Sequence, residues 1–283
     1  MKSLSNHIIT NTGELRATGK LDREQVPSYD LVITAKDKGT PSLKSSVQCK
    51  VTVTDVNDNR PIFEETSYDI SIYENTPSKT KILEIRATDA DIGANGLVSY
   101  RIKSAPFSHV FSIDSTTGEL STVSPLDREI TSSYRLTVEA RDQGSPSLDN
   151  SVTVNIKILD INDNNPIIKT PLNLNPINES VSVGFKIGKI VATDADEGVN
   201  GELIYSITEQ RNSDFFRIDS NSGEVFLNNR VDRETQDTHR VTITVMDKGN
   251  PVLSSDIEHV IRILDDNDNE PVFDKSIYSG MFF

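Results

Sequence analysis

The sequence predicts an all-β protein built of tandem seven-stranded Greek-key sandwiches. Three observations lead to this fold class. Much of the chain consists of short runs in which apolar and polar residues alternate, these runs are bounded by Gly, Pro and Asn, and the whole pattern recurs with a fixed period. No stretch has the spacing of a long amphipathic helix. Strands patterned in this way bury one face in a core shared by two sheets.

The period is set by a short acidic segment that occurs three times. It reads DVNDN at 55–59, DINDN at 160–164 and DDNDN at 265–269, and a proline follows each copy two residues later. The step between copies is 105 residues both times. Other motifs keep this step without a gap, namely the glycine-acid pairs at 13, 118 and 223, the Asp-Arg-Glu triples at 22, 127 and 232, and the loops DKGTPSL, DQGSPSL and DKGNPVL that begin at 37, 142 and 247.

The period divides the chain into two full repeats and two fragments. We predict a partial repeat at 1–59 (repeat one), full repeats at 60–164 and 165–269 (repeats two and three), and the start of a truncated further repeat at 270–283. Repeat one aligns with 106–164, so it lacks three strands of the sandwich and is expected to be poorly stable alone. We interpret the chain as a piece of a longer array.

Repeat two contains about seven alternating runs, the number expected for a two-sheet sandwich. They include Tyr68–Ile72, Ile82–Ala87, Val98–Ile102, Phe111–Ile113, Tyr134–Ala140 and Val152–Ile158.

Repeat three departs from this pattern in its first strand. Asn173 and Asn175 stand where repeat two has Tyr68 and Ile70, and Pro176 follows them. Because proline cannot donate to a sheet ladder, we expect this strand to be shifted in register or bulged at the sheet edge.

Two residues at one repeat position need separate interpretation. Cys49 alternates with valines along a strand, which predicts a buried small hydrophobic residue on the inward face, and no second cysteine is present to form a disulfide. His259 occupies the same position in repeat three. We expect it to be partly buried with a satisfied ring, because no second histidine lies near it in the pattern.

Composition excludes several classes of partner. The net charge of -14 argues against nucleic acid and anionic lipid, both of which require a basic surface. No apolar run reaches the length of a signal peptide or a membrane span. Any membrane attachment is therefore expected through a transmembrane segment of the parent protein that this chain lacks.

The acidic segment itself indicates a metal site. Asp160, Asn162, Asp163 and Asn164 crowd oxygen atoms into a stretch with little apolar surface, and Pro166 prevents a helix. Two carboxylates 4 Å apart repel each other by roughly 4 kcal/mol in a partly screened setting, so they require a counter-charge. Hard divalent cations prefer oxygen ligands, and Ca²⁺ accepts flexible sites with many oxygens more readily than Mg²⁺ does.

Other interpretations of these acids are weaker. A single acidic residue is more often a solvated surface charge than a metal ligand. Acidic residues that recur at the same repeat position in every copy favour the metal site instead. An EF-hand fits poorly, because DADEGVNGELIY has tyrosine where the loop needs a bidentate glutamate, and a calcium-binding nonapeptide solenoid needs a nine-residue period. Paired carboxylates can hydrolyse glycosides, yet no single cleft explains a cluster in every repeat. The sequence has no GxSxG or HExxH motif, and its four histidines share no repeat position, so we expect neither an enzyme nor a small-molecule substrate.

The motifs LDRE, DINDNNP, ATDADEGVNG and ARDQGSP resemble the extracellular repeats of cadherins, in particular the long non-classical group of protocadherins and the Fat and Dachsous kind. The resemblance covers both full repeats and both fragments. It implies immunoglobulin-like sandwiches joined end to end, with three calcium ions held at each boundary by both neighbours.

For the boundary between repeats two and three, the resemblance implies ligands from both sides. The upper repeat would supply the side chains of Glu74, Asp127, Glu129, Asp160, Asn162 and Asp163 and the carbonyls of Ile161 and Asn164. The lower repeat would supply the side chains of Asp194, Asp196 and Asp247 and the carbonyl of Asn200, with Gly198 and Gly201 permitting the tight turn. Eight carboxylates facing three Ca²⁺ ions leave about two negative charges uncompensated.

The other two sites implied by the resemblance are incomplete. Between repeats one and two the ligands would be Asp22, Glu24, Asp55, Asn57, Asp58, Asp89, Asp91 and Asp142, with carbonyls at Val56, Asn59 and Asn95. The counterpart of Glu74 would precede Met1, so we expect weaker loading there. After repeat three, an upper half-site would contain Glu179, Asp232, Glu234, Asp265, Asp266, Asn267, Asp268 and Asn269. This half-site has no following segment like Asp194–Asp196 (DAD), so it should bind calcium poorly.

The resemblance implies calcium-dependent cell-cell adhesion at the extracellular face of the plasma membrane, with a like or related ectodomain as partner. A structural spacer that sets reach and stiffness is the alternative, and a calcium-dependent hydrolase is a third possibility. Asn178 lies in the one glycosylation sequon, whose use stays open. Arg23, Arg128 and Arg233 are expected to form surface or strand-edge ion pairs rather than partner contacts.

Overall fold

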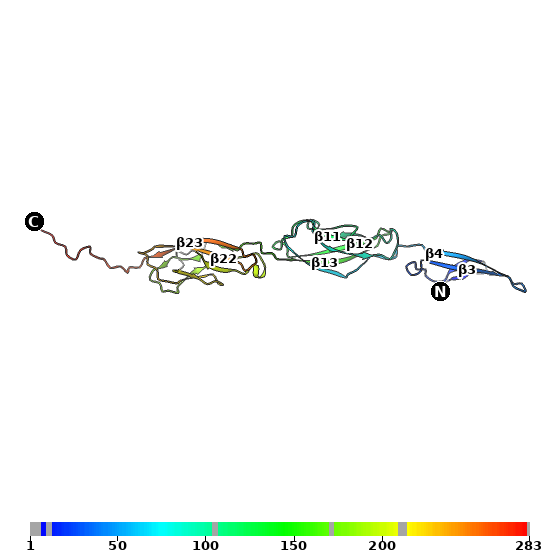
Figure 1. Cartoon of the computed structure of the whole chain (residues 1–283), viewed down its shortest axis with the longest axis horizontal. Helices are drawn as coiled ribbons and strands as arrows, with labels where there is room; N and C mark the ends of the chain where they lie inside the picture. Colours follow the sequence, from blue (N-terminus) through cyan, green and yellow to red (C-terminus); the bar gives the residue numbers. More distant parts are fainter. Residues whose placement is uncertain (1–6, 10–12, 104–106, 170–172, 209–213, 282–283) are drawn as a thin grey trace. The chain divides into compact units, whose positions relative to one another are not determined.

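The computed structural model describes residues 7–9, 13–103, 107–169, 173–208 and 214–281. The chain folds into two compact units, Met1–Leu159 and Asp160–Phe283, which are described separately (Figure 1). Strands dominate both units, as the alternating runs predict. Among the described residues, no helix is long and apolar enough to cross a membrane.

Repeat two is a two-sheet sandwich, which confirms the predicted fold class. One sheet has the order β6 (Ser67–Tyr73), β13 (Asp149–Leu159), β12 (Ser133–Arg141) and β9 (Ser99–Ile102), and the other has the order β10 (Phe111–Ile113), β11 (Glu119–Thr122) and β7 (Lys81–Glu84). A further pair joins β5 (Ile62–Phe63) to β8 (Ala87–Thr88). All pairings are antiparallel except that of β6 with β13, which is parallel.

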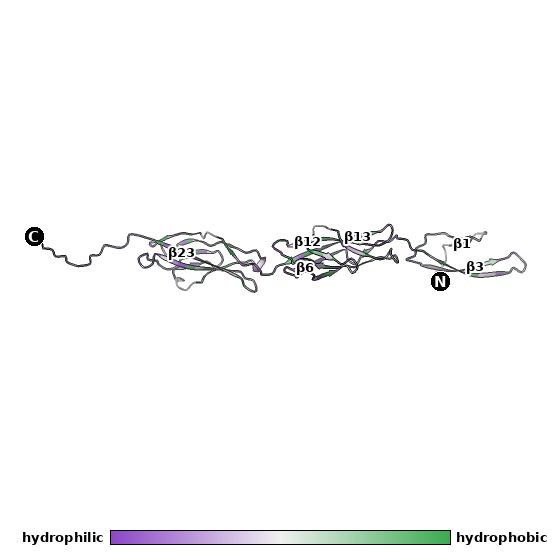
Figure 2. Cartoon of the chain, turned by 90° about the horizontal axis from the view of Figure 1, so that it is seen from above, coloured by the Kyte–Doolittle hydropathy of each residue, from purple (hydrophilic) through white to green (hydrophobic). Residues whose placement is uncertain are grey.

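The core of repeat two lies between these sheets. Alternate residues of β12 and β13, such as Leu136 and Val154, are fully buried, and most of the residues between them are more exposed. Figure 2 colours these strands by hydropathy, with hydrophobic and hydrophilic segments along them. Tyr134 packs edge-on against Phe107 and Phe111, with ring centroids 5.4 and 5.1 Å away. Each large apolar side chain buried in this way stabilises the fold by roughly 1.5–3 kcal/mol.

Repeat three has the same architecture. One sheet has the order β16 (Ile177–Asn178), β23 (Ser254–Leu264), β22 (Thr238–Met246) and β19 (Ile204–Ile207), and the other has the order β15 (Asn173–Leu174), β17 (Lys186–Lys189), β21 (Glu224–Leu227) and β20 (Phe216–Ile218). β14 (Ile167–Ile168) pairs with β18 (Ala192–Thr193), and the 3-10 turn η2 (Gly198–Asn200) follows.

The first strand of repeat three is broken rather than shifted in register. Ile177 pairs with Ile263, which is the pairing of Ile72 with Ile158 moved by 105 residues, so the expected register shift is wrong. The preceding part, β15, instead pairs with β17 in the opposite sheet. Pro176 lies at the break, where it needs no backbone donor. The strand therefore crosses from one sheet to the other at the proline.

Repeat one is an open hairpin. It contains β1 (His7–Ile9), β2 (Leu15–Ala17), β3 (Ser28–Lys36) and β4 (Lys44–Thr52), and β3 pairs with β4 throughout. Its described residues form two separate two-stranded sheets, β1–β2 and β3–β4, without the strands that β6, β7 and β9 add to the sheets of repeat two. Val47 is consequently 62% exposed, whereas its counterpart Val152 is 4% exposed. Cys49 is only half-buried, so the prediction of a buried cysteine is wrong for the same reason.

The two histidines on the long strands of repeat three differ in environment. His259 is half-buried; burial lowers its pKa, and a hydrogen bond with the backbone of Leu174 acts in the opposite direction. His239 is 1% exposed and packs against Phe215 and Phe216, where repeat two has Tyr134. Neither ring nitrogen of His239 has a hydrogen-bond partner among the described residues, and burial lowers its pKa.

The open hairpin of repeat one should exchange its amide protons quickly. Hydrogen exchange followed by mass spectrometry is expected to show fast exchange in β3 and β4 and slow exchange in β12 and β13, because only the latter lie over a complete core. Equal protection of the two hairpins would contradict this account.

His239 should make repeat three sensitive to acid. The folded state holds this imidazole neutral, whereas the unfolded chain protonates it below a pH of about 6.5, so stability is unaffected above that pH and falls as the pH drops below it. His239→Tyr, which restores the residue of repeat two, should remove this part of the pH dependence. Denaturant unfolding of both proteins between neutral and acidic pH would measure it, and parallel curves would contradict the assignment.

Candidate metal centres

Each acidic segment begins just after the last strand of a repeat. Residues 55–59 follow β4, residues 160–164 follow β13, and residues 265–269 follow β23. The Asp58 amide donates to the Val56 carbonyl at 2.8 Å, and the Asp268 amide donates to the Asp266 carbonyl at 2.8 Å. These tight turns, and the proline that follows, keep the segments out of the sheets.

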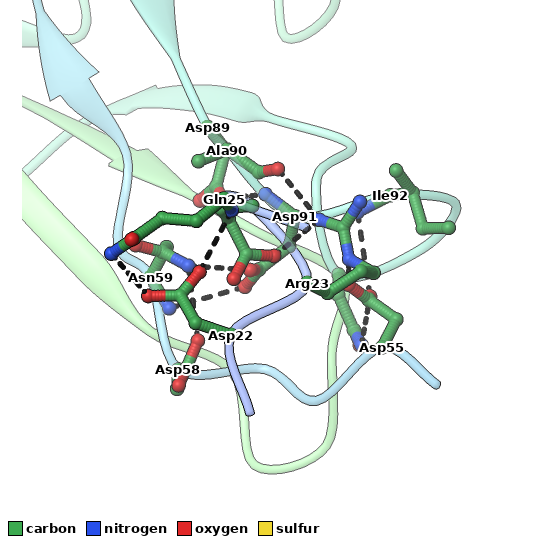
Figure 3. Close-up of polar contacts among 12 residues, drawn as sticks. Asp22, Arg23, Gln25, Asp55, Asp58, Asn59, Asp89, Ala90, Asp91 and Ile92 are labelled. Atoms are coloured by element: carbon green, nitrogen blue, oxygen red, sulfur yellow. Dashed lines mark hydrogen bonds and ion pairs between the residues drawn. The ribbon is translucent and has the colours of Figure 1, made fainter. Parts of the chain in front are cut away.

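Three carboxylates from distant parts of the sequence meet where repeat one adjoins repeat two. Glu24, Asp58 and Asp91 each offer an oxygen within 4.8 Å of the others, and we call this set the first cluster. Figure 3 shows Asp58 and Asp91 together with Asp22, whose two oxygens accept hydrogen bonds from the backbone and side chain of Gln25, both at 2.9 Å.

Two asparagines of the acidic segment connect repeat one to repeat two. Asn59 donates from its amide and its side chain to Asp91, at 3.2 and 2.7 Å. Asn57 donates from Nδ2 to Asp142 Oδ2 at 3.2 Å and to the Pro146 carbonyl at 2.6 Å. Both side chains thus donate to repeat two, and Asn59 Nδ2 also donates to Asp58 of repeat one at 3.0 Å.

Gly144 makes the approach of Asn57 possible. A Cβ at Gly144 would lie 2.3 Å from Asn57 Nδ2, a distance that real side chains do not reach. The glycine in DQGSPSL thus leaves room for the Asn57 side chain, a role that the sequence pattern did not reveal.

Two side-chain oxygens at this junction receive no hydrogen bond. Asn57 Oδ1 and Asp89 Oδ2 are buried and have no hydrogen-bond partner among the described residues. Burial, followed by the negative charges of Asp91 and Asp142, raises the pKa of the Asp89 carboxyl above its usual value. Buried oxygens of this kind are costly unless a cation or a donor satisfies them, so the junction fits a bound cation.

A second cluster, Glu74, Asp127 and Glu129, lies at the far end of repeat two. Its oxygens also lie within 4.8 Å of one another, and Glu74 is 2% exposed. Glu74 Oε2 accepts a hydrogen bond from the Arg128 amide at 2.7 Å, and Asp127 Oδ1 accepts one from the Ile130 amide at 2.9 Å. Burial, followed by the charge of Glu74, raises the pKa of Glu129.

The Asp160–Phe283 unit repeats the arrangement of asparagines found at the first junction. Asn164 donates from its amide and side chain to Asp196, at 3.3 and 2.7 Å. Asn162 donates to Asp247 Oδ2 at 3.0 Å and to the Pro251 carbonyl at 2.5 Å.

The acceptors of this unit match those of the first junction as well. Asn162 Oδ1 and Asp194 Oδ2 are buried without a hydrogen-bond partner in the described chain. A Cβ at Gly249 would lie 2.3 Å from Asn162 Nδ2. Burial raises the pKa of Asp196, and the charges of Asp194 and Asp160 add to this effect.

The turn that carries Asp194 and Asp196 depends on two glycines, as predicted. Gly198 has φ +61°, and a Cβ at Gly201 would lie 2.3 Å from the Asp196 carbonyl oxygen. The predicted ligands of the boundary between repeats two and three are thus divided between the two units, and their union into one site stays a prediction.

A third cluster, Glu179, Glu234 and Asp265, lies at the end of repeat three. Glu179 accepts from the Asp266 amide and the Arg233 amide, both at 2.7 Å. Burial, followed by the charges of Glu179 and Asp268, raises the pKa of Glu234.

The third cluster opens onto a hollow of about 300 Å³. Four of the predicted residues line it, namely Glu179, Asp232, Asp266 and Asp268. Asn267 and Asn269 are exposed beside it.

Asp55, the first aspartate of the first acidic segment, has more hydrogen-bond and ion-pair partners in the chain than its neighbour Asp58. Asp55 pairs through Oδ1 with Arg23, and its Oδ2 accepts from the Ile92 amide at 3.3 Å and from Asn95 Nδ2 at 2.9 Å. Desolvation, the largest influence, acts to raise the pKa of Asp55, but the hydrogen bonds from Asn95 and Ile92 and the charge of Arg23 hold it below its usual value.

Asp160 is held in the same way. It accepts from the Glu197 amide at 3.0 Å and from Asn200 Nδ2 at 2.8 Å. The side chains of Asn95 and Asn200 are thus occupied by aspartates, while the predicted metal contact of each asparagine is its carbonyl.

The three arginines of the Asp-Arg-Glu triples form ion pairs, but the side chains of Arg23 and Arg128 are only 12% exposed, so these two pairs do not lie on the surface as expected. Arg23 lies 2.5 Å from Glu24, Arg128 lies 2.6 Å from Glu129, and Arg233 lies 3.4 Å from Asp265.

Comparisons with known proteins agree with this arrangement. The family model described as "Cadherin domain" matches residues 5–54, 68–159 and 175–264. Human protocadherin Fat 4 is 40% identical over 270 residues, which are 95% of this chain and 5% of that protein. The chain therefore spans about a twentieth of the length of this curated relative.

Solved structures agree as well. A crystal structure of mouse cadherin-23 EC22-24 has a TM-score of 0.83 and 30% identity, covering 92% of this chain and 82% of that one. The structure of a protocadherin gammaB7 EC3-6 cis-dimer has a TM-score of 0.78 and 33% identity, covering 90% of this chain and 64% of that one. The family match covers most of the chain and the fold agrees with it throughout both units. The chain belongs to the cadherin family, and its repeats are of the protocadherin and Fat type.

Proposed function

We propose that this chain is part of an ectodomain that mediates calcium-dependent cell-cell adhesion at the extracellular face of the plasma membrane. Its repeats, bounded as predicted at 59, 164 and 269, would be stiffened by calcium at their junctions. The observation that carries the proposal is the pair of buried, donorless oxygens at the first junction, Asn57 Oδ1 and Asp89 Oδ2, which lie among predicted ligands and recur as Asn162 Oδ1 and Asp194 Oδ2.

The donor set suits calcium better than other metals. The three clusters contain carboxylates and no histidine or cysteine, which excludes the usual ligand sets of zinc and copper. Their carboxylates come from flexible turns, and carbonyls and an asparagine side chain adjoin them, as expected for a cation with six to eight oxygen ligands. Glu24, Asp58 and Asp91 would hold calcium at the first junction together with Asn57 and Asp89.

The chain prepares the first junction for the cation. Asn59 holds Asp91, and Asn57 holds Asp142, so carboxylates of repeat two are fixed by side chains of repeat one. The raised pKa of Asp89 shows that its negative charge is disfavoured where it lies. Bound calcium would supply positive charge to carboxylates of both repeats at once. At ten times its dissociation constant, each ion would add about 1.4 kcal/mol to the stability of the joined form.

The partner would be the same or a related cadherin ectodomain. Support comes from the cis-dimer of protocadherin gammaB7 repeats, whose structure this chain resembles over 90% of its length. A spacer role is the second candidate, because the chain spans only about a twentieth of its human relative, so adhesive contacts have room to lie in other repeats. No feature of the clusters favours a hydrolase over either role.

We expect Asp163→Ala to abolish cooperative calcium binding at the boundary between repeats two and three. The variant removes the second of the two carboxylates in the acidic segment 160–164. Isothermal titration calorimetry should show a lower stoichiometry than in the wild-type chain, while Asp256→Ala, which removes an exposed acid of β23, should leave the titration unchanged. Unchanged stoichiometry and affinity in Asp163→Ala would contradict the assignment.

Adhesion and spacing can be separated with coated beads. If the described repeats form the adhesive contact, beads that carry the chain should aggregate with calcium and disperse in chelator. Beads that stay dispersed at saturating calcium would favour the spacer role, provided that calorimetry shows the ions bound.

A further inference from the structure

The outer face of the four-stranded sheet of repeat two carries a group of positively charged side chains. They alternate along β12 and β13 with the buried residues of the core, so they lie on the opposite side of the sheet. All of them are exposed. We call the five residues the basic row: Arg101, Lys103, Arg135, Arg141 and Lys157.

The strand register makes the row continuous. Lys157 is one outward position from Arg135 on the neighbouring strand, and Arg141 is one outward position from Arg101. Lys103 lies between the two pairs, where its amide donates to β12 at 2.8 Å. From the usual spacing of strands and of outward residues, successive members lie about 7–8 Å apart and the row spans roughly 25 Å.

Negative charge on this face is sparser and partly buried. Glu139 is 2% exposed, and its two oxygens lie 2.6 Å from Arg101 Nε and 2.9 Å from Lys103 Nζ. The other two acids of the face are Asp69 on the edge strand β6 and Asp149 at the start of β13. The exposed part of the face therefore carries more positive than negative charge, although the chain as a whole has a net charge of -14.

The row keeps its donors accessible to a ligand. Arg135 and Lys157 form no ion pair among the described residues. Arg101 and Lys103 are 61% and 52% exposed even though they pair with Glu139. Because charges are screened beyond about 8 Å at physiological ionic strength, an anion bound on this face is governed by the row rather than by the distant acids of the chain.

Repeat three shows that the row is not a general feature of the sandwich. The residues 105 positions later are Ser206, Thr208, Arg240, Met246 and Arg262. On β23, Asp256 and Glu258 stand where repeat two has uncharged residues, and Arg240 pairs with Glu258 at 2.5 Å. The corresponding face of repeat three is thus electrically balanced, and it also exposes Val260 and Leu264.

The chemistry of the face restricts the kind of partner. Along the row, the outward positions of β6, β9, β12 and β13 hold only Ser, Thr, Asn, Asp, Glu, Arg and Lys, and Tyr73 and Leu159 lie beyond its end. Protein interfaces have an apolar or aromatic centre, and single-stranded nucleic acid stacks on aromatic rings. A face without either kind of residue suits a partner that binds through its charge.

We propose that the basic row binds a sulfated polysaccharide. Sulfate oxygens accept paired hydrogen bonds from guanidinium groups and attract ammonium groups, and clusters of Lys and Arg are typical of heparin-binding surfaces. A row of roughly 25 Å matches an extended polyanion rather than a single small anion. The inference rests on the proposed function only for the extracellular location, where such polysaccharides occur.

Surface plasmon resonance with immobilised heparin tests the proposal on the complete chain. The wild-type chain should bind at physiological ionic strength and lose affinity as sodium chloride is added. Arg135→Gln combined with Lys157→Gln should weaken binding about tenfold, because two charge contacts are lost. The matched control, Arg240→Gln with Arg262→Gln, removes the same charge at the same positions of repeat three and should leave the affinity unchanged.

Two further measurements exclude a general loss of structure and define the ligand. Arg101→Lys with Lys103→Arg keeps both charges beside Glu139 and should retain most of the binding. Slow hydrogen exchange in β12 and β13 must be preserved in every variant. Hyaluronan, which carries carboxylates but no sulfate, should bind more weakly than heparin, and equal affinity for the two polymers would overturn the sulfate assignment.

Two other outcomes would overturn the proposal. The first is equal heparin affinity of the wild-type chain and of Arg135→Gln with Lys157→Gln. The second is a loss of bead aggregation in that variant while heparin binding is unchanged, which would make the acidic surface of a second copy the partner of the row.

The same assays separate this proposal from calcium-dependent adhesion. A chain that binds heparin in chelator but neither binds calcium nor aggregates beads would refute the adhesive function and support the basic row. A chain that binds calcium and aggregates beads but does not bind heparin would refute the basic row alone.

Discussion

The repulsion between carboxylates that consecutive repeats bring together is the constraint on which the rest of the structure depends. At the first junction, Glu24 and Asp58 of repeat one and Asp91 of repeat two lie within 4.8 Å of one another. Such a set is stable only if positive charge or hydrogen-bond donors compensate it. The chain provides some donors of its own, through asparagines and one arginine, and leaves specific acceptors unsatisfied. The backbone turns that follow the last strands thus place carboxylates where a cation would compensate them.

The first junction contains two kinds of polar group: side chains that bond to the other repeat, and buried oxygens that have no hydrogen-bond partner in the described chain. Asparagine and arginine side chains form bonds between repeats one and two, and these bonds set the positions of the acids. The buried oxygens of Asn57 and Asp89 form none within the described chain and remain available. The same division recurs 105 residues later within the Asp160–Phe283 unit, down to a glycine that allows the asparagine to approach. Two independent instances of one geometry show that it follows from the motif rather than from local accident.

The strands and the acidic motifs could be predicted because both depend on local patterns. Period-two alternation determines which face of β12 or β13 is buried, and the fixed step of 105 residues aligns the acids. Contacts between segments that are distant in the sequence could not be predicted from local patterns. Asp55 is identical in type to Asp58, and only the structure shows that Arg23 and Asn95 occupy it. Gly144 resembles any turn glycine until the position of Asn57 is known.

Two expectations failed because they depended on parts of the fold that local patterns do not show. The first strand of repeat three was expected to shift in register or to bulge at the sheet edge, whereas the chain changes sheets at Pro176 and the part after it keeps the register of repeat two. Cys49 has the pattern of a core residue, but among the described residues its sheet consists of β3 and β4 alone and lacks the flanking strands that help to enclose the core of repeat two.

The account is tested most directly by small-angle X-ray scattering of the chain at saturating calcium and in chelator. If shared calcium stiffens the junctions, the calcium-bound chain should scatter as a more extended and less flexible particle than the chelated chain. Superimposable scattering curves under the two conditions, with calcium shown to be bound, would contradict it.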